Sequence, residues 1–274
     1  MEPQRTQPTM QSDLAFSCQN LSVEVTTKEG VKRLLDPIDF SVRKGEILSI
    51  IGTSGAGKTT LLRALGGLIP TTENSEVLAD GVPIQGPPDR VLMVFQDYAS
   101  SLLPWRTIRK NVALGLETQY RGKELQKRVE SALDLVGLRK RADEYPWRLS
   151  GGMQQRVQIA RALAMEPSVL LMDEPFGALD AITKNSLQDE LLRVQEQTGA
   201  TIIFITHDVE EAVYLGDRVL ALGGIPGRII EVLDVDLPRP RHQIYTKELP
   251  EFLRLRHRAY ESVVEAELRL RSEE

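Results

Sequence analysis

The chain has 274 residues, 41% hydrophobic and 27% charged, with a formal net charge of −5. This length allows one large domain or two small ones, and the acidic balance argues against nucleic-acid binding through a broad basic surface. The single Cys18 excludes an internal disulfide, and no apolar run is long enough to span a bilayer. The segment "MEPQRTQPTMQSD" lacks the apolar centre of a signal peptide. We therefore expect a globular protein of the cytoplasm.

Strand and helix patterns alternate along most of the chain. Alternating apolar and polar residues predict a half-buried strand over residues 16–25. Short, mainly apolar runs predict strands within residues 45–52, 90–96, 168–174, 200–208 and 217–222. Apolar residues at helical spacing predict helices over 57–67, 151–165, 181–198 and 208–215. Such alternation is typical of an α/β fold with a mostly parallel core sheet.

Three other segments define the expected domain organisation. Residues 1–15 are predicted to be a disordered tail preceding a domain of residues 16–241. Residues 97–148 have helical periodicity without a strand-like run, so they predict an inserted helical subdomain that extends, with the next helix, over about 97–165. The proline-rich "DLPRPRHQ" then leads to an extension, 242–274, in which an amphipathic helix is expected over roughly 248–270.

The first candidate site is "GTSGAGKT", residues 52–59, which matches G-x-x-x-x-G-K-[ST] between a predicted strand and a predicted helix. Glycines let the backbone curl so that successive N–H groups point at phosphate oxygens, and the helix adds its positive end. Lys58 would reach the β- and γ-phosphates, and the Thr59 hydroxyl would bind Mg²⁺. A chance glycine-rich turn is the alternative. The residues assigned to phosphate binding are Gly52, Thr53, Ser54, Gly55, Ala56, Gly57, Lys58, Thr59 and Thr60.

The second candidate site is "VLLMDE", a predicted strand that ends in two adjacent carboxylates. Beside a phosphate-binding loop, Asp173 would approach Mg²⁺ through water, and Glu174 would direct a water at the γ-phosphate. The alternative is a pair of helix-capping acids before Pro175.

The third candidate site is "LSGGMQQR", in which Ser150 is a good helix N-cap followed by Gly151 and Gly152. It supplies a second helix end able to bind an anion. Since the loop at 52–59 already surrounds its own phosphates, this second end would serve the phosphate of a neighbouring molecule, as a two-fold dimer allows. On this segment alone, an ordinary capped helix with glycines that permit close packing is the favoured reading.

The order "GTSGAGKT", "LSGGMQQR", "VLLMDEP" and "ITHD" resembles the ATP-binding-cassette (ABC) ATPases over about residues 16–235. The resemblance implies a P-loop NTPase of the ABC type, with an antiparallel β subdomain, a helical subdomain, ATP and Mg²⁺. It also implies that Leu149 to Met153 form the signature loop, which contacts the partner subunit's ATP. By the same resemblance, Gln96 senses Mg²⁺ and the attacking water, Asp180 lies at the dimer interface, and His207 touches the γ-phosphate.

Two positions depart from the family pattern. The family usually places an aromatic residue after the first strand to stack on adenine, but that position falls on or near Val25, and no aromatic residue lies between Phe16 and Phe40. The fifth signature residue is Met153 rather than Gln, which removes a side-chain donor. Phosphate binding is unaffected by either change, whereas the contact to adenine is left open.

Residues 97–112 and 226–241 are similar to the ATPases of nitrate, sulfonate, taurine and bicarbonate importers. This implies an ATPase subunit at the cytoplasmic face of the inner membrane, peripheral to it. Its partners would be a second ATPase subunit, permease subunits docked near 97–112 and, indirectly, an extracytoplasmic solute-binding protein, with no nucleic acid. For Leu103, Pro104 and Trp105, packing within the helical subdomain is an alternative to docking. A soluble ABC ATPase and a nucleotide-gated switch are the alternative functions.

Overall fold

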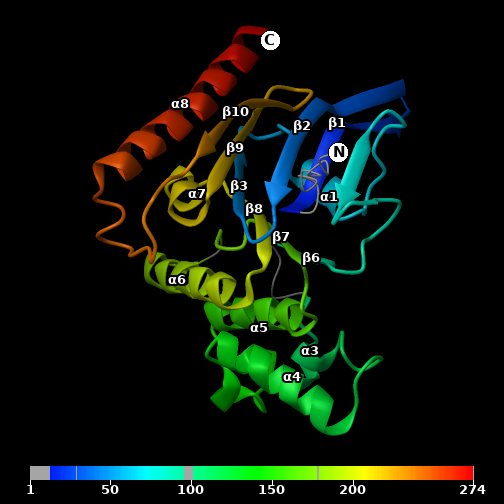
Figure 1. The fold of residues 1–274 in the computed structure, drawn as a ribbon, viewed down its shortest axis with the longest axis vertical. Coiled ribbons are helices and arrows are strands. Elements are labelled where there is room, and N and C mark those ends of the chain that lie inside the picture. Colours follow the sequence, from blue (N-terminus) through cyan, green and yellow to red (C-terminus); the bar gives the residue numbers. More distant parts are fainter. Residues whose placement is uncertain (1–12, 29, 96–100, 178, 274) are drawn as a thin grey trace, which may run out of the picture.

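The computed structural model describes residues 13–28, 30–95, 101–177 and 179–273. A six-stranded sheet in the order β10-β9-β3-β8-β7-β6 forms its centre (Figure 1). All neighbouring strands are parallel except β10, which is antiparallel to β9. The strands are β3 (Ile47–Gly52), β6 (Val91–Val94), β7 (Val169–Asp173), β8 (Thr201–Ile205), β9 (Arg218–Gly223) and β10 (Arg228–Asp234). The sheet confirms the predicted parallel core, although β10 had no predicted counterpart.

A second, antiparallel sheet of four strands has the order β2-β1-β4-β5, and it confirms the expected antiparallel subdomain. Its strands are β1 (Leu14–Thr27), β2 (Gly30–Arg43), β4 (Glu76–Ala79) and β5 (Val82–Pro83). The expected tail was too long, because β1 begins at Leu14 and the side chain of Ala15 is buried. Residues 1–12, the rest of that tail, lie outside the described residues.

Both faces of the central sheet are covered, which explains why its strands are almost continuously apolar. On one face, α1 (Lys58–Leu65) packs between the central sheet and the antiparallel sheet. The hydrophobic core on this face includes Leu48 and Ile50 of β3. The opposite face is covered by α5 (Gly151–Ala164), α6 (Ala181–Thr198) and α7 (Val209–Leu215). These helices begin and end within two residues of their predicted ranges, since their apolar spacing is regular.

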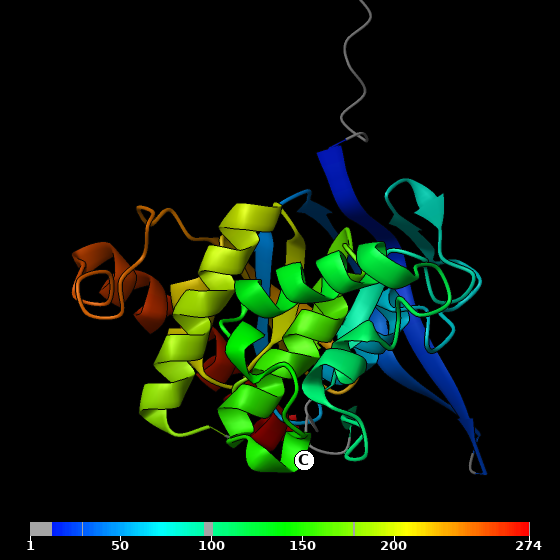
Figure 2. The same cartoon turned by 90° about the horizontal axis from the view of Figure 1, so that it is seen from below.

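The helical subdomain lies at the end of the molecule away from the antiparallel sheet (Figures 1 and 2). It contains α3 (Ile108–Ala113), α4 (Gly122–Leu135) and two short 3₁₀ turns, and α5 joins it to the central sheet. Arg161 of α5 donates hydrogen bonds to the carbonyl oxygens of Ser101 (2.8 Å) and Asn111 (3.1 Å). The packing alternative for Trp105 is wrong, because this side chain is 72% exposed.

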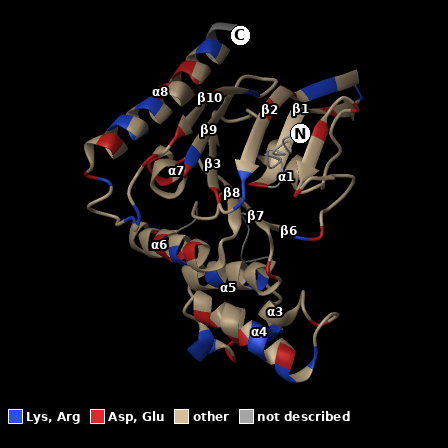
Figure 3. Cartoon of the chain, viewed as in Figure 1, with Lys and Arg blue, Asp and Glu red and all other residues tan. Residues whose placement is uncertain are grey.

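The C-terminal extension contains α8 (Pro250–Glu273), which begins two residues and ends three residues later than the predicted helix. Phe252, Leu255 and Ala259 are buried, and α8 packs on α7, β9 and β10. Charged residues are dense on α4 and α8 and sparse on the central strands (Figure 3). Within the described residues, no helix is both long and apolar enough to cross a membrane.

Candidate functional site at the ends of the parallel strands

The loop between β3 and α1 has the backbone conformation that its glycines predict. Gly55 and Gly57 have φ angles of 81° and 78°, in the left-handed region that side chains disfavour. A Cβ on Gly57 would also lie only 2.6 Å from Leu35 Cδ2. The loop is therefore held in its curled form by conformational demands that glycine alone meets easily.

Lys58, the first residue of α1, folds back over this loop. Its Nζ donates hydrogen bonds to the carbonyl oxygens of Gly52 (2.8 Å) and Thr53 (2.9 Å). Burial lowers the pKa of Lys58, while the negative charges of Glu174 and Asp173 oppose that shift. A phosphate in the loop would give the ammonium a charged acceptor, which forms a stronger hydrogen bond than a carbonyl does.

Thr59 and Asp173 come together although 114 positions separate them in the chain. The Thr59 hydroxyl donates to Asp173 Oδ1 at 3.3 Å. Burial raises the pKa of Asp173 and the charge of Glu174 adds to this, whereas the hydrogen bond from Thr59 opposes it. A hydroxyl and a carboxylate oxygen are hard donors of the kind that Mg²⁺ prefers beside phosphate oxygens. No cluster of three or more His, Cys, Asp or Glu side chains suited to a metal occurs in the described part of the chain, so such an ion would depend on nucleotide and water for its other ligands.

Glu174 lies just beyond β7 and faces His207. Its backbone has a φ of 45°, and its N–H donates to the carbonyl oxygen of Ile205 at 3.1 Å, which fixes it to the end of β8. Its Oε2 lies 3.5 Å from His207 Nδ1. A non-glycine residue in this conformation is typical of a functional site. The next helix, α6, is capped by Asp180, which accepts from the N–H groups of Ile182 and Thr183, so the helix-cap interpretation of Asp173 and Glu174 is wrong.

The signature loop, Leu149 to Met153, is a capped helix end with one tightly packed glycine. The Ser150 hydroxyl accepts from the N–H of Met153 at 3.4 Å, and Ser150 itself is exposed. A Cβ on Gly152 would lie 2.3 Å from Thr183 Cγ2 of α6. Close packing therefore accounts for Gly152, whereas it does not account for the exposed Ser150. Met153 packs against the core, so the departure from Gln exchanges a polar contact for an apolar one.

One predicted position cannot be placed in this cluster, and another lies in a strand of the antiparallel sheet. Gln96, assigned to Mg²⁺ and water, lies outside the described residues. Val25 pairs with Lys32 in the β1–β2 ladder and is 37% exposed. Phe16 and Phe40 are buried, so neither offers a ring face to a base.

The turn between β9 and β10 supports the phosphate-binding loop. The sequence motifs did not predict this contact. Gly227 exchanges backbone hydrogen bonds with Asp36 (2.9 Å) and Leu34 (3.0 Å) of β2. A Cβ on Gly227 would lie 2.1 Å from the Ala56 carbonyl oxygen, so the two loops are in contact. The glycine-rich "GGIPG" was the available signal, but nothing in it indicated which loop it would touch.

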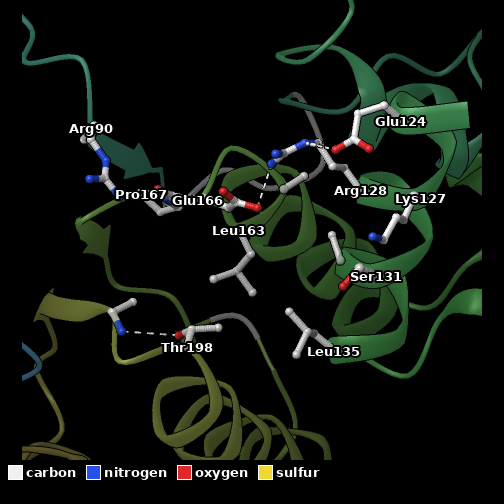
Figure 4. Close-up of a pocket in the computed structure, with 13 residues that line it drawn as sticks. Arg90, Glu124, Lys127, Arg128, Ser131, Leu135, Leu163, Glu166, Pro167 and Thr198 are labelled. Carbon is white, nitrogen blue, oxygen red and sulfur yellow. Dashed lines mark hydrogen bonds and ion pairs between the residues drawn. The ribbon is translucent and has the colours of Figure 1, made fainter. Parts of the chain in front are cut away.

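A separate cavity of about 450 Å³ lies between α4, α5 and the segments that lead into β6 and β7 (Figure 4). Its floor includes Leu135 and Leu163, and Arg128 at its rim donates to Glu124 (3.0 Å) and Glu166 (2.6 Å). None of its lining residues belongs to the phosphate-binding loop or to the acids at the end of β7. Its charges are largely paired, so it is not the nucleotide site.

Comparisons with known proteins agree with this geometry. A family model described as "ABC transporter" matches residues 35–177. The nitrate import ATP-binding protein NrtD of Synechococcus elongatus is 44% identical over 251 residues, which cover 90% of this chain and 89% of NrtD. An uncharacterized ABC transporter ATP-binding protein of Methanocaldococcus jannaschii is 50% identical, covering 76% of this chain and 78% of that protein. The nitrate import protein NrtC of Synechococcus elongatus is 45% identical over 81% of this chain, which spans only 34% of NrtC.

Solved structures show the same architecture. CbiO1 of Clostridium perfringens, part of the ABC transporter complex cbiONQ, aligns with a TM-score of 0.73 and 29% identity, covering 81% of this chain and 89% of cbiO1. An ATP-binding cassette solved as a dimer in a post-hydrolysis state with ADP and Pi aligns with a TM-score of 0.69 and 32% identity, covering 80% and 98% of the two chains. Family match, relatives and fold agree with the cluster at the strand ends: this chain belongs to the ABC transporter family, in its ATP-binding group.

Proposed function

We propose that this chain is the ATP-hydrolysing subunit of an ABC importer and works as a nucleotide-sandwich dimer. The observation that carries the proposal is the series of contacts Lys58–loop carbonyls, Thr59–Asp173 and Glu174–His207 at the ends of neighbouring parallel strands. Ligands bind at this edge in open α/β sheets. In this proposal, the series would bring a cation, a hard-ion donor pair and an acid–imidazole pair to one phosphate.

The described residues would divide the reaction between them. The N–H groups of the loop and the α1 end hold the phosphates, and Lys58 neutralises charge on the β- and γ-phosphates. Thr59 directly, and Asp173 through water, would hold Mg²⁺, which supplies further charge neutralisation when bound. Glu174 positions the attacking water and accepts its proton, while His207 contacts the γ-phosphate. Gln96 is proposed to sense Mg²⁺ and water.

The signature loop gives the reason for a dimer. Ser150 and the amides of Gly151 and Gly152 would contact the γ-phosphate of ATP bound to the partner subunit. The exposed Ser150 supports this role, as does the dimeric state of a similar cassette. A two-fold axis would then give two equivalent sites, each shared by both copies.

The membrane side of the proposal depends on partners. Permease subunits would dock on the helical subdomain near 97–112, where Trp105 is exposed, although residues 97–100 lie outside the described residues. The chain would then be peripheral to the cytoplasmic face of the inner membrane, with a solute-binding protein on the opposite side. Relatives named for nitrate import and bicarbonate transport favour a small anion as solute, in the range of nitrate, bicarbonate, sulfonate or taurine. This subunit does not touch the solute, so the assignment follows from analogy.

Dimer size measured by light scattering with Mg-ATP tests the shared site. Glu174→Gln keeps the geometry but cannot accept a proton, so it should bind ATP and accumulate as a closed dimer. Ser150→Arg should abolish hydrolysis by blocking closure while leaving ATP binding by the single subunit nearly intact. Ser131→Arg, which places the same side chain on the exposed face of α4, is the matched control and should behave like wild type.

The double variant Glu174→Gln/Ser150→Arg decides the question. It should be monomeric under conditions that trap Glu174→Gln as a dimer. If it dimerises as tightly as Glu174→Gln alone, the second helix end is only a capped helix and the sandwich fails. Permease is added if the isolated subunit associates too weakly to measure.

Membrane fractionation tests coupling to transport. The protein should sediment with membranes only when its permease is co-expressed, because it has no apolar span among its described helices. Equal sedimentation with and without permease would contradict docking. Absence from the membrane fraction in both cases would also favour the soluble-ATPase alternative.

A further inference from the structure

The short helix that follows His207 is held at one end by Arg241 and at the other by the C-terminal extension, residues 242–274. At the C-terminal end of α7, the buried Arg241 donates hydrogen bonds to the carbonyl oxygens of Tyr214 and Gly216, both at 2.8 Å. At its N-terminal end, Glu210 receives Lys247 Nζ at 3.0 Å and an Arg256 nitrogen at 3.4 Å. These contacts join residues separated by 25 to 46 positions in the sequence.

Lys247 makes a second contact with the same helix. Its ammonium lies 5.1 Å from the centre of the Tyr214 ring, within the range of a cation–π interaction. Glu210 and Tyr214 are four residues apart, so they lie on one side of α7. One cation of the extension therefore touches two successive turns of this helix.

The helix itself is too short to fix its own position. It has seven residues, and helices of that length depend on tertiary contacts for their stability. Asp208 caps it by accepting from the N–H groups of Glu210 and Glu211, and Lys184 of α6 contacts Asp208 at 2.6 Å. The helix also packs on β3 and β9, where the Ser49 hydroxyl donates to the carbonyl oxygen of Ala212 at 2.8 Å. The Tyr214 hydroxyl donates to Asp189 of α6 at 2.6 Å, and the Glu210 side of the helix faces the extension.

The imidazole of His207 is not enclosed by neighbouring side chains. A cavity of about 600 Å³ is lined by His207 and the start of α7 on one side and by Arg256, His257 and Tyr260 of α8 on the other. The His207 side chain is 67% exposed. Since packing does not locate the ring, its position relative to Glu174 follows from the backbone at the start of α7.

We propose that the C-terminal extension and the preceding Arg241 position His207: Lys247 and Arg256 act through Glu210, and Arg241 acts through the carbonyl end of α7. The inference rests on the proposed function, because it gives His207 a role at the γ-phosphate. Its consequence is a means of control. A partner that pulls α8 away from α7 would slow hydrolysis without weakening nucleotide binding, because the phosphate-binding loop is held by β2 and the β9–β10 turn instead.

Steady-state hydrolysis by Lys247→Met/Arg256→Met tests the proposal. We expect kcat to fall about two- to tenfold, as disruption of a small coupling network typically gives, while KM for Mg-ATP stays near the wild-type value. Arg254→Met/Arg258→Met is the matched control. It removes two cations from the same helix, but these pair with Glu251 of α8 and with Glu231 of β10 and do not touch α7.

Two further variants separate positioning from general stability. Lys247→Arg/Arg256→Lys keeps both charges and should retain most of kcat. Glu210→Lys should lower kcat like the double Met variant, and adding Lys247→Glu and Arg256→Glu to it should restore activity by reversing the pairs. A thermal melt accompanies each variant. If kcat is unchanged in the double Met variant, or falls equally in the control, the extension does not position His207.

Proton NMR provides a readout that does not need hydrolysis. The chain has three histidines, so the His207 ring signals can be identified with His207→Ala. They should shift in Lys247→Met/Arg256→Met and stay in place in the control. Wild type that fails to hydrolyse ATP would contradict the proposed function, whereas an unmoved His207 signal in the double Met variant would contradict this inference alone.

Discussion

The molecule presents two helix N-termini of similar composition, and they are built for different tasks. The α1 end is closed on itself, because Gly55 and Gly57 take left-handed conformations and Lys58 bonds to carbonyls of its own loop. The α5 end is held differently. Gln154 Nε2 donates to the carbonyl oxygens of Pro146 (3.0 Å) and Leu149 (3.3 Å), whereas Ser150 caps its own helix and is exposed. Gly152 lies close to Thr183 of α6.

Glycine therefore has two different structural roles in this chain. At the α1 end it permits a backbone conformation that surrounds an anion. At Gly152 it permits two helices to approach. A phosphate site at the α5 end would therefore depend on its exposed serine and backbone amides, and on a ligand brought by another molecule.

The largest effect is expected when the phosphate-binding loop, residues 52–59, loses its lysine. Lys58→Met should lower Mg-ATP affinity by two or more orders of magnitude, since a partly buried charge on the phosphates is lost with no replacement, at about 1.4 kcal/mol per factor of ten. Isothermal titration with Mg-ATP measures this. Lys28→Met, a lysine of the β1–β2 turn, is the control. ATP binding close to wild type by Lys58→Met would break the assignment of this loop.

The next effect tests whether Gly152 is a packing residue. Gly152→Ala places a Cβ against Thr183 Cγ2 and should cost about 1–3 kcal/mol of the free energy of unfolding, as overpacking typically does. Thr183→Ser removes that methyl group and should restore stability in the double variant, while having little effect alone. Urea denaturation measures all three variants. A double variant that is stable but inactive would assign Gly152 to the dimer interface as well.

Adenine recognition gives a third, smaller effect. Because Val25 offers no ring, wild type should discriminate weakly between ATP and GTP. Val25→Tyr should tighten ATP binding by up to about 1–3 kcal/mol if the position faces the base, which is the range for a base stacked on an aromatic side chain. Competition binding with both nucleotides measures it, with Val31→Tyr on the adjoining strand as control. A strong wild-type preference for ATP would mean that another side chain contacts adenine.

The smallest effect concerns the acid beside Thr59. Burial is the main cause that raises the pKa of Asp173 in the folded protein. At neutral pH the ionised carboxylate therefore lowers the free energy of unfolding. Asp173→Asn should therefore raise the free energy of unfolding of the nucleotide-free protein by about 1 kcal/mol or less, because partial exposure screens the repulsion. The gain should shrink as pH falls through the raised pKa toward 3.8, the ordinary value for aspartate. The same variant should lose Mg²⁺-dependent hydrolysis. Equal thermal stability of wild type and variant at pH 7 would contradict the predicted destabilisation by the ionised Asp173 carboxylate.

Local patterns sufficed for most of the core elements. The continuous apolar runs that became β3, β7 and β8 could only fit strands covered on both faces, and regular apolar spacing located α5 and α6 to within one residue. The strand β10 escaped prediction because only one of its seven residues is buried and its pairing with β9 is not visible locally. The start of β1 was missed because the pairing of Leu14 with Arg43 of β2 is not visible locally either.

The sequence by itself determined the phosphate-binding loop, the two acids after β7 and the order of motifs, because each depends on residue type over a short stretch. Only the tertiary structure decided which distant groups meet: Thr59 with Asp173, Glu174 with His207, and Gly152 with Thr183. The same holds for Glu210 with Lys247 and Arg256. Strand order and helix packing set these distances, and both arise from burying apolar surface over the whole chain rather than from any single segment.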